Sequence, residues 1–422
     1  MFLSLKNVGK IETANITIDA VTIIAGENNT GKSTVGKTLF CIFNSFYKID
    51  EQIETEKLLS IIYQINNNVH SVGLDRNESY LGEIAKSVIN KKDIYINDMT
   101  LLKQDLRKLF VKYDSNFEKS MDKYNLDRLT EQIIFVLNIS NSDAILFNLQ
   151  NKVQSEFKTQ INNLYYPEKT SEILLKIKSN EIKIQIKNNE NSKQIEISDT
   201  INLNTEIIYI DNPYAMDNPY VINQKSTYRT QHHHEHLRMK LNENKTTSVI
   251  DEIITLKRLE KIFEILNSVC PGEMVRKQGN WSFGYKENDT GVLIDVINMS
   301  TGLKTFAIIK TLLLNGSLEE NGTLILDEPE IHLHPNWQLA FAEIIVLPQK
   351  EFNLHILINT HSPYFLDAIE VYSRKHGIAD KCKYYLAEIS DNGMSVISDV
   401  SDDTERIYEK LSKPFQVLAN ES

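Results

Sequence analysis

The chain has 422 residues, of which 41% are hydrophobic and 24% are charged, and its formal net charge is −11. This length and apolar content suffice for a full hydrophobic core and predict two or three lobes. The acidic balance argues against a surface that coats DNA globally and leaves a local basic groove open. No apolar run approaches about 18 residues and no signal peptide begins the chain, so we expect neither a membrane-spanning nor a secreted protein. Three scattered cysteines without metal-ligand spacing fit a reducing cytoplasm.

The N-terminal residues predict two strands and then a phosphate-binding loop. Phe2–Leu5 and Ile11–Ile18 alternate between apolar and polar residues, as half-buried strands do. The apolar run 20–25 follows, and after it comes Gly26-Glu-Asn-Asn-Thr-Gly-Lys-Ser-Thr34, which opens a helix over 35–43. A G-x-x-x-x-G-K-[ST] pattern between a strand and a helix predicts a site for a nucleoside triphosphate.

Each residue type in this loop has a chemical reason. The glycines at 26 and 31 let the backbone curl so that its N–H groups point at phosphate oxygens. Lys32 reaches the β- and γ-phosphates, and the Ser33 hydroxyl completes a Mg²⁺ shell. The predicted nucleotide-binding residues are Gly26, Asn28, Asn29, Thr30, Gly31, Lys32, Ser33 and Thr34.

The following segment has a helical pattern from about Glu51 to Tyr165, and Asn- and Ser-rich breaks interrupt it. No heptad persists, so we expect stacked helices and not long coiled-coil arms. Three alternating strands then follow, at Ile173–Lys178, Glu181–Lys187 and Gln194–Ser198.

A histidine-rich segment comes after a further strand at 205–210. It contains His232, His233, His234 and His236 within Thr230–Leu237. His232 and His236 have the i,i+4 spacing of a metal pair on a helix, and Arg229 with His234 fits a loose Arg-x4-His ribonuclease pattern. We favour a solvated, polar helix start over a contact surface for nucleotide, partner or nucleic acid, and place metal catalysis last.

A helix near Ser248–Val269 and a hairpin around Trp281–Ile297 lead to Asn298-Met-Ser-Thr-Gly-Leu-Lys304. The last segment opens an apolar helix that runs to about Leu314. A Ser and a Gly at a helix N-terminus suit a γ-phosphate, because free N–H groups and the positive end of the dipole lie there. Ser300 and Gly302 are therefore candidate phosphate contacts, although either could belong to an ordinary N-cap.

Two apolar strands near the C-terminus end in polar residues. Residues 323–328 end in Asp327, suited to hold Mg²⁺ directly or through water, and Glu328, suited to act as general base on the attacking water. The strand Leu354–His361 ends in His361, followed by Ser-Pro. The order and spacing of these pieces favour catalytic roles for Glu328 and His361.

Taken together, these motifs resemble the head of an ABC-type ATPase of the SMC/RecF/OLD-like group. The string Asp327-Glu-Pro-Glu-Ile-His-Leu-His-Pro335 is similar to the extended motif of the OLD-like branch. Chain length and Asn359-Thr-His-Ser-Pro-Tyr364 most resemble the ATPase subunits of anti-phage defence systems such as Septu (PtuA-like). Only Ser300 and Gly302 match the helix-start motif of transporters, and no glutamine follows the strand at 206–210.

The resemblance implies an α/β fold, namely a P-loop ATPase head split by a helical and antiparallel-β insertion. It also implies ATP and Mg²⁺ as cofactors, with ATP sandwiched between the phosphate loop of one protomer and Ser300 and Gly302 of another. The expected self-association is thus an ATP-dependent dimer or higher. About 60 residues follow His361, too few for the nuclease domain of longer OLD-type enzymes, so we expect any nuclease to be a separate effector protein.

The leading hypothesis is the sensor ATPase of a bacterial anti-phage complex. Two alternatives stay open: a RecF/SMC-like DNA-repair ATPase, and a nucleotide-gated scaffold with little turnover. The expected division of the chain is 1–50 and 201–375 for the two parts of the head, 51–200 for the insertion, and 376–422 for a C-terminal strand and helix.

Overall fold

The computed structural model describes residues 1–70, 78–113, 125–158, 160–163, 165–189, 192–217, 232–243, 249–276 and 283–421. These residues form two compact units. The larger unit combines Met1–Tyr47 with Leu149–Ser422, and the smaller one is Lys48–Asn148.

The larger unit is built on a sheet that has 11 strands among the described residues, in the order β6-β5-β4-β1-β2-β14-β13-β3-β12-β11-β7. Its parallel part consists of β7 (Ile207–Ile210), β11 (Thr323–Asp327), β12 (His355–Thr360), β3 (Val21–Gly26) and β13 (Lys383–Ile389). All six residues of β3 and all five of β11 are buried. Continuous apolar runs of this kind are typical of parallel strands that are covered on both faces.

The rest of the sheet is mostly antiparallel. It contains β14 (Ser395–Asp399), β2 (Ile11–Thr17), β1 (Phe2–Val8), β4 (Ser171–Ile177), β5 (Asn180–Asn189) and β6 (Ser192–Ile197). Neighbouring strands here pair antiparallel, except that β14 runs parallel to β2. The mixed sheet with covering helices confirms the predicted α/β class.

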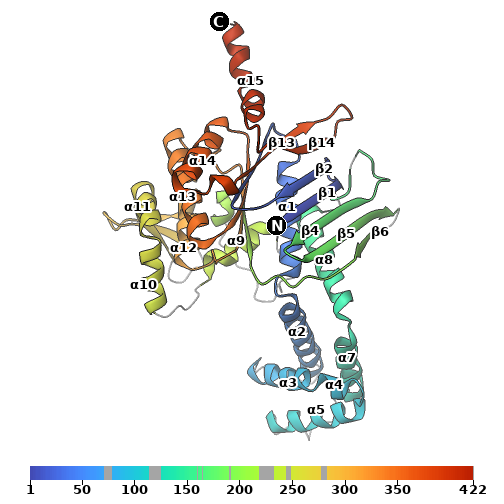
Figure 1. Cartoon of the computed structure of the whole chain (residues 1–422). Coiled ribbons are helices and arrows are strands. Elements are labelled where there is room, and N and C mark those ends of the chain that lie inside the picture. The colour runs from blue at the N-terminus through green and yellow to red at the C-terminus, as the bar shows by residue number, and fades with distance from the viewer. Residues whose placement is uncertain are drawn as a thin grey trace. The chain divides into compact units, whose positions relative to one another are not determined.

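Helices cover both faces of the parallel strands. On one face, Leu324 and Leu326 of β11 share a core with α11 (Glu260–Val269), α12 (Thr301–Leu314), α13 (Pro335–Phe352) and α14 (Pro363–His376), which gather together in Figure 1. Ile325 lies between those two leucines and points to the opposite face. On that face, α1 (Lys32–Phe46) packs closely: a Cβ added at its Gly36 would lie 3.1 Å from Cγ2 of Ile325.

The larger unit also contains a second, smaller sheet and three further helices. They are a small sheet of β8 (Gly272–Arg276), β9 (Phe283–Glu287) and β10 (Leu293–Asp295), and the helices α9 (His233–Asn242), α10 (Val249–Arg258) and α15 (Glu405–Glu421). The predicted helix near 248–269 is thus two helices that meet at Leu259. The predicted hairpin corresponds to β9 and β10, and its first residues, 281–282, lie outside the described residues.

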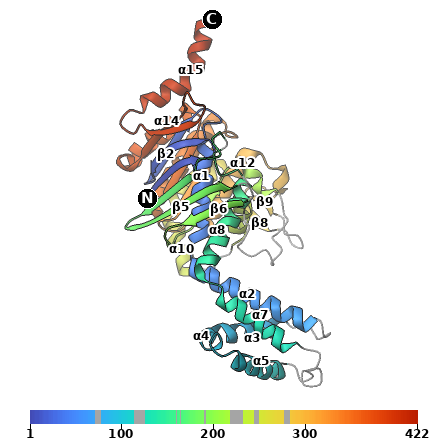
Figure 2. The ribbon, with the colours of Figure 1, turned by 90° about the vertical axis from the view of Figure 1, so that its right-hand side faces the viewer.

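The smaller unit consists of stacked helices, as the sequence pattern predicts. It contains α2 (Ile49–His70), α3 (Glu78–Asn90), α4 (Lys92–Tyr95), α5 (Met99–Tyr113), α7 (Leu126–Asn138) and the first half of α8 (Asn141–Phe157), and Figure 2 shows α2, α3, α5 and α7 packed together. Its core is mostly aliphatic, with Ile61, Ile65, Ile84, Leu102 and Ile133 fully buried, and it also contains Tyr95 and Phe110.

Two expected boundaries differ from this division. The strands β4, β5 and β6, expected in the insertion, extend the head sheet, because β4 pairs with β1 in register from Phe2↔Lys176 to Lys6↔Glu172. The expected C-terminal piece also joins the head, where β13 lies beside β3 and β14 beside β2. Both differences arise from pairings between residues far apart in the chain.

Within the described part of the chain, no single helix is long and apolar enough to cross a membrane. The pair α7 and α8 passes by length and composition, but it is bent by 81° at its break.

Candidate nucleotide-binding site

The phosphate loop connects β3 to α1, and its two glycines sit where a side chain would not fit. A Cβ at Gly26 would lie 2.5 Å from the carbonyl oxygen of Ala387 in β13. Gly31 has a φ of +82°, and its Cβ would lie 2.9 Å from Cγ1 of Ile11. The left-handed backbone and the close approach both require glycine, so the loop geometry follows from the sequence pattern.

The ammonium of Lys32 lies inside the curl of this loop. Its Nζ donates to the carbonyl oxygens of Gly26 and Glu27, both at 2.8 Å, and lies 3.7 Å from Oε1 of Glu328. The side chain is only 4% exposed, and this burial lowers the pKa of Lys32 despite the nearby carboxylates. Thr30 is also buried, whereas Asn28, Asn29 and Ser33 are exposed and Thr34 is partly so.

Asp327 ends β11 beside the loop, with both carboxylate oxygens held. Tyr209 of β7 donates its hydroxyl to Oδ2 at 2.7 Å, and Asn359 of β12 donates its side-chain amide to Oδ1 at 2.9 Å. Parallel register explains the second contact, because Asp327 is directly opposite Asn359. Neither partner was predicted: Tyr209 reads as an ordinary core residue of an apolar strand.

The carboxylate of Glu328 lies between the side chains of Lys32 and His361. Oε1 lies 3.7 Å from Nζ of Lys32 and 3.5 Å from Nδ1 of His361. The backbone of Glu328 has a φ of +50°, and its N–H donates to the carbonyl of Asn359 at 2.9 Å. Contact with His361, followed by the charge of Lys32, outweighs burial and lowers the pKa of Glu328. The same contact raises the pKa of His361.

A second glutamate, Glu330, supports His361 and was not predicted as a site residue. Its Oε1 accepts hydrogen bonds from the Thr360 hydroxyl and from the backbone N–H of His361, the latter at 3.3 Å. Its Oε2 is buried and has no hydrogen-bond partner among the residues that the structure describes. Burial raises the pKa of Glu330. The only feature of the sequence that could have indicated a role for Glu330 is its position as the third acidic residue of Asp327-Glu-Pro-Glu330.

Ser300 and Gly302 lie at the start of α12. Ser300 is exposed and caps the helix, accepting a long 3.4 Å hydrogen bond from the N–H of Leu303. A Cβ at Gly302 would lie 2.9 Å from the carbonyl oxygen of His332, so glycine permits close packing there. No hydrogen bond between described residues joins Ser300 or Gly302 to the phosphate loop of the same chain.

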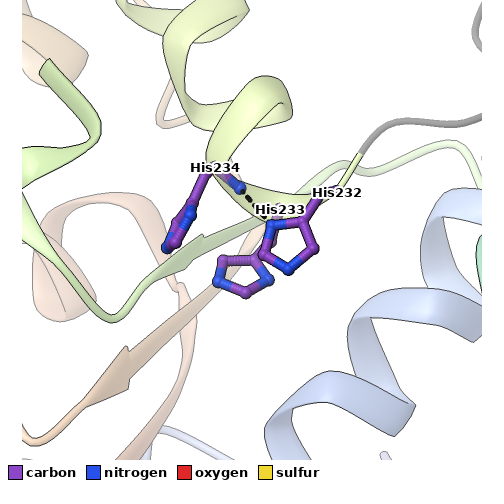
Figure 3. Close-up of side chains that lie close together, drawn as sticks. All are labelled: His232, His233 and His234. Atoms are coloured by element: carbon purple, nitrogen blue, oxygen red, sulfur yellow. Dashed lines mark hydrogen bonds between the residues drawn. The ribbon is translucent and has the colours of Figure 1, made fainter. Parts of the chain in front are cut away.

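The predicted solvated histidine cluster is only partly solvated. His233 is 1% and His236 is 3% exposed, whereas His232 and His234 are partly exposed. Figure 3 shows the rings of His232, His233 and His234 close together at the start of α9, with ligand atoms within 4.8 Å of one another. The interpretation as a solvated helix start is therefore wrong for His233 and His236.

Carboxylates explain the burial of these two rings. Glu156 and Asp211 lie at the two ring nitrogens of His233, and Glu206 lies 3.0 Å from Nε2 of His236. His232 is the N-cap of α9, and its ring lies with those of His233 and His234, whereas the ring of His236 faces Glu206. The side chains of His232 and His236 therefore do not converge as the expected metal pair. Arg229 of the ribonuclease pattern lies outside the described residues.

Two curated proteins show local similarity to this chain. The protein named "Retron Ec83 probable ATPase", from Escherichia coli, is 27% identical over 138 residues, which are 29% of this chain and 25% of that protein. The protein named "Retron Vc95 probable ATPase", from Vibrio cholerae serotype O1 biovar El Tor, is 31% identical over 90 residues, 19% of this chain and 17% of that protein. The matches thus span a quarter or less of these relatives.

Among solved structures, an Smc head domain with an extended coiled coil from Pyrococcus furiosus, bound to the C-terminal domain of ScpA, aligns with a TM-score of 0.42 and 10% identity. The alignment covers 98% of this chain and 99% of that one. The family model described as "AAA ATPase domain" matches residues 1–366, which include the phosphate loop, Asp327, Glu328 and His361. The chain therefore belongs to the AAA ATPase domain family.

Proposed function

We propose that this chain is a Mg²⁺-dependent ATPase subunit of a bacterial anti-phage defence complex and works with a separate effector protein. The observation that carries the ATPase part is the meeting of four side chains at the carboxyl ends of β3, β11 and β12. These are Lys32, Asp327, Glu328 and His361. The defence part is supported by the two relatives named as retron ATPases and by the resemblance of Asn359–Tyr364 to the ATPase subunits of anti-phage systems.

The donor set fits a magnesium nucleotide. The loop offers N–H groups around a glycine cradle, Lys32 offers a cation, and Ser33 and Asp327 offer the oxygen ligands that Mg²⁺ prefers. Bound Mg²⁺ would neutralise charge on the phosphates. Lys32, at present bonded to two loop carbonyls, would exchange these for phosphate oxygens.

Glu328 and His361 have distinct parts in this proposal. A lowered pKa keeps Glu328 ionised, so its carboxylate can orient a water molecule and accept its proton. A raised pKa favours the protonated ring of His361, which then offers positive charge beside Glu328 where charge develops on the transferred phosphoryl group. Glu330 holds the backbone of His361 in place.

The exposed start of α12 suits a second copy of the chain. Ser300 is exposed, and three large apolar side chains near it in sequence or space are also exposed: Tyr214 by 48%, Ile297 by 61% and Ile331 by 52%. Tyr214 contacts Thr301, with 3.0 Å between their hydroxyl oxygens. Exposed apolar surface around a helix N-terminus supports an interface that brings Ser300 and Gly302 to the nucleotide of another protomer.

Two measurements test the proposal. The purified chain should hydrolyse ATP with Mg²⁺ and stop when EDTA removes the metal, and Glu328→Gln with ATP should shift from monomer to dimer in light scattering. Turnover that persists in EDTA, or a Glu328→Gln chain that stays monomeric with bound ATP, would contradict the catalytic and the dimer part respectively.

The defence role needs the native operon. A tagged chain should co-purify with an effector, and Lys32→Ala should abolish protection of cells against phage while leaving expression unchanged. Equal protection by the wild type and by Lys32→Ala would separate the ATPase from defence.

A further inference from the structure

His233 is held between two carboxylates in the interior of the larger unit. Its Nδ1 lies 2.7 Å from Oε2 of Glu156, and its Nε2 lies 2.8 Å from Oδ2 of Asp211. A neutral imidazole can donate from only one nitrogen, so two carboxylate partners favour the doubly protonated ring. These contacts outweigh burial, raising the pKa of His233 and lowering the pKa values of Glu156 and Asp211.

The ring of His233 also stacks on Tyr209. Their centroids are 4.4 Å apart, with an angle of 26° between the planes. The Tyr209 hydroxyl donates to Oδ2 of Asp327 at 2.7 Å. A cation over the phenol ring favours this arrangement and fixes the ring plane from which the hydroxyl reaches Asp327.

A second connection runs through Asp211. This residue directly follows β7 and lines the same small pocket as Asp327 and Glu328. Glu156 lies at the other end of the arrangement, in the last turn of α8, and its Oε1 accepts the backbone N–H of His233 at 2.6 Å. The contacts of His233 with Glu156 and Asp211 thus connect the end of α8, the end of β7 and the start of α9.

A metal ion is the competing explanation for three adjacent histidines. However, both ring nitrogens of His233 already face carboxylates, and Nε2 of His234 lies 2.7 Å from Oδ1 of Asp211. Contacts with carboxylates therefore account for the positions of His233 and His234 in Figure 3.

We propose that His233 is a positioning residue for the ATPase site: clamped between Glu156 and Asp211, it orients Tyr209, and Tyr209 orients Asp327. The inference rests on the proposed function, in which Asp327 holds the Mg²⁺ of the nucleotide. It assigns a role to the histidine segment that neither the motifs nor the family match supplies.

The test measures the affinity of the full chain for a fluorescent ATP analogue in Mg²⁺ and in EDTA. The ratio of the two dissociation constants reports the Mg²⁺-dependent gain in binding. Tyr209→Phe and His233→Gln should each reduce this ratio by about tenfold, the scale of residues that orient a metal ligand, and leave affinity in EDTA unchanged. The Tyr209→Phe, His233→Gln double variant should show no further reduction, because one residue acts through the other.

His236→Gln is the matched control. His236 lies on the same helix, is equally buried and also faces a carboxylate, but its described ring contacts are with Phe40 and not with Tyr209. Its ratio should equal that of the wild type. Because His233→Gln removes the partner that the carboxylates of Glu156 and Asp211 share, a Glu156→Gln, His233→Gln chain is the second test variant, with the same expected reduction.

Three results would overturn the inference. The first is an unchanged ratio in folded His233→Gln or Glu156→Gln, His233→Gln chains while Asp327→Asn lowers it, which leaves the proposed function intact. The second is an additive loss in the double variant with Tyr209→Phe. The third is one equivalent of transition metal in the wild type that His233→Gln abolishes. An unchanged ratio in Asp327→Asn would instead refute the Mg²⁺ role of Asp327 itself.

Discussion

Lys32 and Glu328 lie 3.7 Å apart, but the account assigns them to different steps, so their substitutions should separate binding from turnover. Lys32→Ala removes a buried ammonium whose charge-assisted contacts with phosphate are worth about 1.5–3 kcal/mol. ATP should then bind about 10- to 150-fold more weakly. Glu328→Gln keeps the shape of the side chain and removes a carboxylate that competes with phosphate for Lys32. Its affinity should be equal to that of the wild type or slightly tighter.

The rate of hydrolysis at saturating ATP should fall more in Glu328→Gln than in Lys32→Ala. Loss of the general base lowers the hydrolysis rate by about 10²- to 10⁴-fold at saturating ATP. Titration with a fluorescent ATP analogue gives affinity, and phosphate release gives turnover. Lys37→Ala, five residues along α1 at a partly exposed position, is the control for the loss of a lysine charge from this helix and should match the wild type in both assays. Equal loss of ATP affinity in Lys32→Ala and Glu328→Gln would refute the division of roles.

Three further predictions concern single residues. His361→Ala should slow hydrolysis with little change in ATP affinity, and unchanged turnover would return it to a structural role. Burial alone would raise the pKa of Glu206, but the hydrogen bond from His236 and the ammonium it faces lower it to about 2 from the usual 4.5. The lowered pKa stabilises the folded state by about 3 kcal/mol above pH 4.5, and this stabilisation is lost as the pH falls towards 2. Glu206→Gln should therefore weaken the pH dependence of the free energy of unfolding measured in urea, and an unchanged pH dependence would contradict the prediction. Gly302→Ala should lower the unfolding temperature, because its Cβ meets backbone at 2.9 Å, whereas Gly82→Ala, in open space on α3, should raise it; the reverse order would disprove the packing argument.

The parts of the site that the sequence predicts well are local. A strand, a loop of fixed spacing and a helix define the surroundings of Lys32 within a few residues. The strand ends at Asp327 and His361 meet the loop because parallel neighbours bring their carboxyl ends to one edge of a sheet.

The residues that sequence reasoning misses act across elements. Tyr209 and Asn359 hold Asp327 from two neighbouring strands, and only strand order reveals them. A run of histidines suggests solvent or a metal, because the carboxylates of Glu156 and Asp211 come from distant segments. The same cause hides the pairing of β4 with β1, which moves three strands from the expected insertion into the head.

The central claim is that two chains build each complete ATPase site, with Lys32 from one and Ser300 from the other. Lys32→Ala and Ser300→Arg chains should be mixed in equal amounts and assayed for ATP hydrolysis. The ATP concentration should lie well below the dissociation constant of the Lys32→Ala chain, so that each chain alone hydrolyses little ATP. In a mixed dimer one site carries both lesions and the other carries none, so random pairing should restore about one quarter of wild-type activity. No recovery, with mixed dimers confirmed by differently tagged chains, would show that Ser300 does not act on the partner's nucleotide.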